Sequence, residues 1–172
     1  MRKFQTVSVV GLGYIGLPTA AAFASRGINV IGVDVNQQTV DTINRGEIHI
    51  VEPELDMIVQ AAVAEGYLNA TLTAEPADAF LIAVPTPFYP SENADEIPQP
   101  NLSYIESAAK AIAPVLKKGD LVILESTSPV GATEQMASWL AEARSDLTFP
   151  QTHNEESDIR IAHCPERVLP GH

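Results

Sequence analysis

The sequence has little of what several classes of protein require. Its one cysteine, Cys164, excludes an internal disulfide and any metal site built from several cysteines. No apolar run is long enough to span a bilayer and the first residues lack a signal-peptide pattern, so we expect a cytoplasmic protein without a membrane partner. Positive charge is also scarce. Ten lysines and arginines stand against 22 acids, and the net charge of −12 argues against nucleic acid as a partner.

Apolar residues make up 45% of the 172 residues, enough to bury one sizeable core. Apolar runs typical of strands alternate with patterns typical of helices. They predict strands at 6–10, 30–34, 70–73, 79–84, 121–125 and 159–163, and helices at 14–25, 38–44, 54–64, 103–116 and 133–143. We expect a loop at 85–100 and exposed chain at 150–158. This order predicts one Rossmann-type α/β domain over residues 1–172, a doubly wound, mostly parallel sheet with helices on both faces.

A glycine-rich turn follows the first predicted strand. Gly11, Gly13 and Gly16 form the pattern G-x-G-x-x-G between an apolar strand and an alanine-rich helix. In a dinucleotide site, the first glycine permits the tight turn, the second lets the backbone approach the pyrophosphate, and the third lets helix and strand pack closely. Unpaired N–H groups at the start of the helix then face the phosphates. We interpret the turn as a cofactor site; the alternative is a tight turn without a ligand.

Asp34 ends the second predicted strand. A carboxylate at this place accepts hydrogen bonds from the ribose hydroxyls and repels the 2′-phosphate of NADP. Because Val35 and Asn36 follow it rather than an arginine, the sequence favours NAD as the cofactor. In the alternative interpretation, Asp34 only caps the helix that begins near Gln37.

Three further segments, 84–87, 125–131 and 164–171, follow predicted strands. Ligands of parallel sheets bind outside the carboxyl ends of the strands, so we expect these segments to converge on the nicotinamide end of the cofactor. We expect Glu125 to be bonded to nearby backbone and assign it no chemistry. Cys164 is expected to be a small, buried apolar side chain.

At these segments the chain resembles the UDP-glucose/GDP-mannose dehydrogenase family. The shared elements are, in order, the glycine-rich turn, the acid Asp34, V-P-T-P at 84–87, S-T-S-P-V-G at 126–131 and P-E-R-V-L-P-G at 165–171. They cover nearly the whole chain. Within the family, the chain is most similar to the branch of enteric bacteria that oxidises UDP-N-acetyl-D-mannosamine. UDP-glucose is the alternative substrate.

The resemblance implies a four-electron oxidation of the sugar C6 alcohol to a carboxylate, with two NAD and one water. In the enteric branch the product serves the synthesis of a surface polysaccharide, enterobacterial common antigen. Glu166 matches the family's acid, which acts with the threonine matched by Thr127 on a water in the active site. The residues expected along the cofactor are Gly11, Gly13, Tyr14, Ile15, Gly16, Asp34, Val84, Pro85, Thr86 and Thr127, and those along the sugar are Arg167, Val168, Leu169 and Pro170.

Other interpretations of these residues stay open. Glu166 could pair with Arg167 on a surface loop, and Thr127 could cap the helix that follows it. One position also departs from the glucose-oxidising branch, which has a second glutamate where this chain has Pro170. This departure weakens the case for UDP-glucose.

In the family that this chain resembles, several catalytic groups and other parts of the enzyme lie beyond the position that His172 matches. They include the nucleophilic cysteine, a lysine and an asparagine that stabilise the oxyanion, the uridine-binding half and a long helix through which members form homodimers. We therefore expect this chain to bind NAD but not to oxidise a UDP-sugar alone. Two alternatives are a non-catalytic NAD-binding module and a dehydrogenase of a small hydroxy acid or acyl group.

Overall fold

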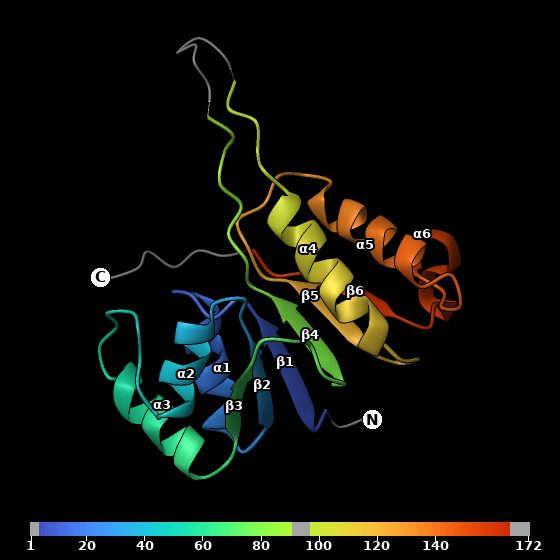
Figure 1. Ribbon diagram of the computed structural model, residues 1–172. Helices are drawn as coiled ribbons and strands as arrows, with labels where there is room; N and C mark the ends of the chain where they lie inside the picture. Colours follow the sequence, from blue (N-terminus) through green and yellow to red (C-terminus); the bar gives the residue numbers. More distant parts are fainter. Residues whose placement is uncertain (1–3, 91–96, 166–172) are drawn as a thin grey trace.

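A computed structural model describes residues 4–90 and 97–165 of the chain (Figure 1). Within these residues one sheet contains β1 Thr6–Val10, β2 Asn29–Val33, β3 Leu68–Thr71, β4 Ala79–Ile82, β5 Leu121–Leu124 and β6 Arg160–His163. The helices are α1 Gly16–Ala24, α2 Gln37–Asn44, α3 Leu55–Ala64, α4 Ser103–Ile112, α5 Ala132–Ala143 and α6 Pro150–His153. Short 3₁₀ turns follow α4 at Ala113–Val115 and α6 at Asn154–Glu156. No helix in these ranges has the length and hydropathy that crossing a membrane requires.

The sheet has the order β3-β2-β1-β4-β5-β6, and all neighbouring strands in the described residues are parallel. The chain builds outward from β1 to β3 and then crosses back to place β4 on the other side of β1. This reversal creates a switch point between β1 and β4, where doubly wound sheets bind dinucleotides. The strand ends are level there, since Val10 pairs with both Val33 and Ile82. The predicted Rossmann-type fold is confirmed.

The alternation of side chains along the central strands explains why both faces of the sheet are covered. On β4, Ala79 and Leu81 face one hydrophobic core, whereas Phe80 and Ile82 face the other. The first core is completed by α1, α2 and α3 and the second by α4 and α5, so the helices form two groups about the sheet (Figure 1). All four residues of β4 are buried, as expected for a central parallel strand.

Proline explains two differences from the predicted ranges. The helix α4 ends at Ile112 because Pro114, in the following 3₁₀ turn, lacks the N–H that would continue the α-helical hydrogen bonds. The segment 150–158 contains α6, which the sequence did not predict. Pro150 starts this helix, and the preceding Phe149 is buried with 1% of its surface exposed. A helix of four residues is too short to produce a periodic apolar pattern.

The strand β6 lies at the edge of the sheet and is largely exposed. Among the described strands it pairs with β5 alone, and Arg160, Ala162 and His163 are exposed. Cys164 follows at the same edge and is also exposed, so the prediction of a buried cysteine is wrong. An edge strand has a neighbouring strand on one side only, so fewer of its side chains are covered. The sequence of β6 alone did not show that this strand would lie at the edge.

Candidate functional site

The glycine-rich turn lies at the switch point, between the end of β1 and the start of α1. Gly11 has a φ of +91°, and a Cβ there would lie 2.7 Å from the carbonyl oxygen of Ala83. A Cβ on Gly16 would lie 1.8 Å from the carbonyl oxygen of Gly11. These distances leave no room for a side chain, so packing alone requires glycine at both positions.

Gly13 differs from these two glycines because it faces open space. Apart from Gly13 itself and its two chain neighbours, no described residue has an atom within 4 Å of the position that its Cβ would occupy. Packing within the chain does not require glycine here. A ligand that contacts the backbone does require it, because a side chain would keep the ligand away. The helix α1 begins three residues later, and the N–H groups and dipole of its first turn favour an anion at this end. A pyrophosphate meets both conditions.

Asp34 follows β2 and is hydrogen-bonded to the glycine-rich turn. Its Oδ2 accepts a hydrogen bond from the N–H of Leu12 and its Oδ1 one from the N–H of Asn36, both at 2.9 Å. The interpretation of Asp34 as a helix cap is wrong. Asn36 is the N-cap of α2, and its side-chain oxygen accepts from the N–H groups of Gln38 and Thr39. Each carboxylate oxygen has further acceptor capacity, so Asp34 can also accept hydrogen bonds from the hydroxyls of a ligand.

An apolar cavity of about 300 Å³ lies beside Asp34. Val33 and Leu72 come from the ends of β2 and β3, and Tyr104 and Ala108 come from α4 on the other side. Apolar walls next to a carboxylate that binds ribose suit a purine base. The sequence did not identify the α4 residues as part of a site, because they follow the same apolar spacing as ordinary core residues.

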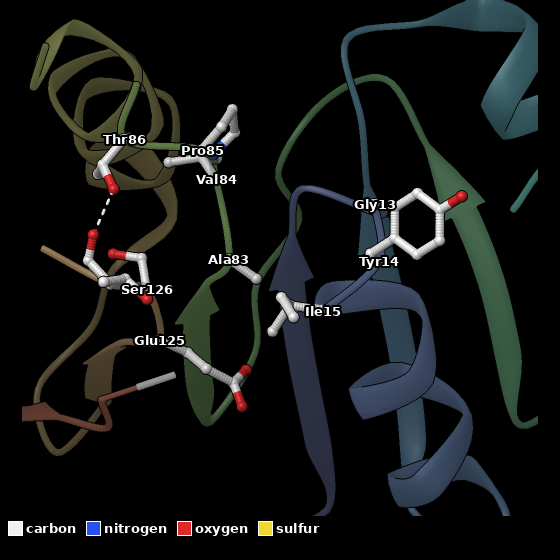
Figure 2. A pocket seen from close by; sticks show the side chains of 10 residues that line it. Gly13, Tyr14, Ile15, Ala83, Val84, Pro85, Thr86, Glu125 and Ser126 are labelled. Atoms are coloured by element: carbon white, nitrogen blue, oxygen red, sulfur yellow. Dashed lines mark hydrogen bonds between the residues drawn. The ribbon is translucent and has the colours of Figure 1, made fainter. Parts of the chain in front are cut away.

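A second cavity, of about 370 Å³, lies on the other side of the turn, over the ends of β4 and β5. Three segments line it, 13–15, 83–86 and 125–127 (Figure 2). The hydroxyl of Thr86 donates a hydrogen bond to the carbonyl oxygen of Thr127, which joins two of these segments. The cavity thus brings together Tyr14, Ile15, Val84, Pro85, Thr86 and Thr127 of the predicted cofactor residues.

Thr127 does not cap the next helix, as one interpretation of the sequence held. The N-cap of α5 is Gly131, four residues after Thr127. Thr127 instead belongs to the wall of the second cavity. Its neighbour Ser126 lines the same wall and is buried, with 6% of its surface exposed.

Glu125 contributes a carboxylate to the second cavity. The sequence predicted that its segment, 125–131, reaches this end of the cofactor but assigned the carboxylate no chemistry. Its Oε1 accepts a hydrogen bond of 3.3 Å from the hydroxyl of Thr19 on α1, and its Oε2 is buried. Figure 2 shows the side chain reaching from the end of β5 towards Ile15. The place of Glu125 directly after a strand was a signal. Thr19 lies 106 residues away, however, and no local pattern links the two.

The third predicted segment lies mostly outside the described residues. The N–H of Cys164 donates a hydrogen bond of 2.9 Å to the carbonyl oxygen of Leu124, which brings the chain to the end of β5. Glu166 and the predicted sugar-binding residues, 167–170, follow beyond the described range, and their roles stay predictions. Among residues 4–90 and 97–165, no group of three or more histidine, cysteine or acidic side chains is placed to hold a metal ion.

These surfaces follow one another across the switch point in a fixed order. The apolar cavity comes first, then Asp34, then the open side of Gly13 at the start of α1, and then the second cavity. A base, a ribose, a diphosphate and a second nucleoside, joined in that order, fit these surfaces one by one. The fold and the site therefore define the chain as a dinucleotide-binding domain of the Rossmann class.

Comparison with known proteins narrows this class. The family model described as "UDP-glucose/GDP-mannose dehydrogenase family, NAD binding domain" matches residues 5–172. The chain belongs to this family, and its dinucleotide is NAD.

Relatives and solved structures agree with the family. The chain is 70% identical to an NDP-N-acetyl-D-galactosaminuronic acid dehydrogenase of Ralstonia nicotianae and 69% identical to a UDP-N-acetyl-D-mannosamine dehydrogenase of Yersinia pestis, each over 169 residues. These matches cover 98% of this chain but 38% and 39% of the relatives, so the chain spans about two fifths of their length. The solved UDP-N-acetyl-mannosamine dehydrogenase from Staphylococcus aureus superposes with a TM-score of 0.84 at 41% identity, over 96% of this chain and 38% of that one.

Proposed function

We propose that this chain is the NAD-binding part of a UDP-N-acetyl-D-mannosamine 6-dehydrogenase, which oxidises the C6 alcohol of the sugar to a carboxylate with two NAD and one water. The observation that carries the proposal is the second cavity, which Thr86, Glu125 and Thr127 line, whereas Asp34 lines the first. A dinucleotide whose adenosine ribose is held at Asp34 reaches this cavity with its nicotinamide. Hydroxyl and carboxylate groups there suit the oxidation of an alcohol.

The proposed sugar is supported by the relatives and by one residue. Two relatives of nearly equal identity are named UDP-N-acetyl-D-mannosamine dehydrogenase and NDP-N-acetyl-D-galactosaminuronic acid dehydrogenase. Both names contain a nucleotide-linked, N-acetylated sugar, which favours that class over UDP-glucose. Pro170 supports the same choice, because it stands where the glucose-oxidising branch has a glutamate.

In this proposal NAD supplies the hydride acceptor, and residues of the chain hold and orient it. Asp34 accepts hydrogen bonds from the adenosine ribose, and the open side of Gly13 admits the diphosphate to the backbone. Thr127 and Glu166 act on the water of the second oxidation step, since a carboxylate beside a hydroxyl can orient and deprotonate water. The segment 167–170 lies along the sugar.

We propose that the complete enzyme is a homodimer in the cytoplasm. Its product would serve the synthesis of a surface polysaccharide, enterobacterial common antigen. The chain described here spans about two fifths of its relatives, so we propose that turnover needs the remaining part. Nucleophilic and oxyanion-stabilising groups each contribute orders of magnitude to a rate. The chain by itself should therefore bind NAD without forming NADH from the UDP-sugar.

A chimera tests this proposal, with the chain replacing the matching residues of the Yersinia pestis enzyme. We expect the chimera to form two NADH for each UDP-N-acetyl-D-mannosamine, and the chain alone to form none. In the chimera, Glu166→Gln should lower the rate at least about a hundredfold and leave the NAD affinity unchanged. A folded chimera that binds NAD but forms no NADH would contradict the proposal and favour a non-catalytic NAD-binding module.

A further inference from the structure

We infer that Glu125 makes this site prefer oxidised NAD over NADH and is a specificity-determining residue at the nicotinamide end. The inference rests on the proposed function, which places the nicotinamide in the second cavity. The oxidised ring carries a positive charge and the reduced ring is neutral. A carboxylate fixed at the wall of that cavity therefore attracts one form of the ring and not the other.

The position of Glu125 is fixed by its main chain and by its side chain. Its N–H donates a hydrogen bond of 2.8 Å to the carbonyl oxygen of Ile82, which holds the residue against the end of β4. Its Oε1 accepts from the hydroxyl of Thr19, whose helix begins at the glycine-rich turn. Figure 2 shows the carboxylate below Ala83 and beside Ile15, both of which line the cavity. The negative charge is thus placed at the cavity wall rather than in bulk water.

The surroundings of Glu125 favour a strong effect on a neighbouring cation. Among the described residues that line the second cavity, Glu125 has the only carboxylate. The others contribute backbone, hydroxyl groups and apolar side chains. Because Oε2 is buried, water screens its charge less than it screens a surface charge.

The described residues at the adenosine and diphosphate end do not distinguish the two redox forms. Asp34 and the start of α1 face the adenosine ribose and the diphosphate, which are identical in NAD and NADH. Among the described residues, Glu125 is the one whose carboxylate lies in the cavity proposed for the nicotinamide ring. When a hydride, with its two electrons, reaches the ring, the positive charge and its attraction to Glu125 are lost together. The proposed reaction uses two NAD for each sugar, so easier release of NADH between the two steps would assist it.

Calorimetric titration of the chain with NAD, NADH and ADP-ribose tests this inference. Glu125→Gln should lower the affinity for NAD about tenfold relative to that for NADH, because the carboxylate charge is removed in nearly the same volume. The affinity for ADP-ribose, which lacks the nicotinamide, should not change. Glu142→Gln is the matched control. It removes the same charge near the C-terminal end of α5, outside the residues that line the second cavity, and should leave the ratio unchanged.

A second variant keeps the inference testable if the glutamine variant folds poorly. Glu125→Asp retains the charge and should keep most of the preference, with an unchanged thermal melt. Equal effects of Glu125→Gln on NAD and NADH, or the same ratio in the aspartate and glutamine variants, would overturn the inference and leave the proposed function standing. Failure of the wild-type chain to bind any of the three ligands would overturn both.

Discussion

The half of the sheet from β1 to β3 shapes its part of the cleft mainly with backbone, whereas the half from β4 to β6 does so mainly with side chains. In the first half, a Cβ on Gly11 or Gly16 would meet a main-chain oxygen, and Asp34 accepts hydrogen bonds from two main-chain N–H groups. In the second half, the side chains of Thr86 and Glu125 connect segments that lie 41 and 106 residues apart. The first half therefore depends on main-chain geometry, whereas the second half depends on side-chain hydrogen bonds between segments distant in sequence.

The difference predicts how each region responds to substitution. Changes at Gly11 and Gly16 should disturb the backbone and with it the fold, because the atoms that a new Cβ would meet are main-chain oxygens and not flexible side chains. Changes in the second half should alter ligand binding or local stability by smaller amounts. The following variants test this division, beginning with the largest expected effect.

Gly16→Ala should be the most damaging substitution. Its methyl group would lie 1.8 Å from the carbonyl oxygen of Gly11, so the turn or the helix must move. We expect a loss of at least about 3 kcal/mol in the free energy of unfolding, measured by urea denaturation. Gly13→Ala is the matched control. Because the space beside Gly13 is open, this variant should remain within about 1 kcal/mol of the wild type but bind NAD at least about tenfold more weakly. Equal stability losses in the two variants would contradict the packing described for the turn.

Asp34→Asn should have the next largest effect. The amide has no negative charge to repel the 2′-phosphate of NADP, and it replaces one acceptor oxygen by a donor. We expect the affinity for NAD to fall about tenfold and the preference over NADP to disappear in calorimetric titrations. Unaltered discrimination between the two cofactors would show that another group sets it.

Thr86→Val should have a smaller effect, confined to the second half. The valine cannot donate to the carbonyl oxygen of Thr127, so the two loops lose one connection. We expect a loss of roughly 1 kcal/mol in the free energy of unfolding. Thr86→Ser keeps the hydroxyl and should recover most of that loss. A serine variant as unstable as the valine variant would assign the effect to the lost methyl group instead.

Asp146→Asn should produce the smallest change, limited to stability. Hydrogen bonds from the Arg144 guanidinium lower the pKa of Asp146 to about 2, below the ordinary value of 3.8. A carboxylate with a lowered pKa adds stability above the unfolded-state pKa and loses it as the pH falls towards the folded-state value. The difference in melting temperature between wild type and variant should therefore be present at pH 7 and disappear between about pH 4 and pH 2. A difference that persists below pH 2 would exclude this pair as its source.

The same comparison explains how much the sequence could predict. The fold and the first half of the site depend on short-range patterns, namely glycine spacing, apolar runs and an acid at the end of a strand. In the structure, Gly11 and Gly16 shape the turn, and Asp34 is hydrogen-bonded to it. The missed features depend on tertiary neighbours. The carboxylate of Glu125 is held by Thr19, 106 residues away, and Cys164 is exposed where the chain leaves the edge strand β6. The neighbouring sequence predicts neither feature.

The central claim is that Asp34 and the open side of Gly13 form a site for the adenosine and diphosphate parts of NAD. Titrating NAD and NADP into the 172-residue chain tests it most directly. NAD should bind at least about tenfold more tightly than NADP. Equal affinities, or no binding of either cofactor by the folded chain, would contradict it.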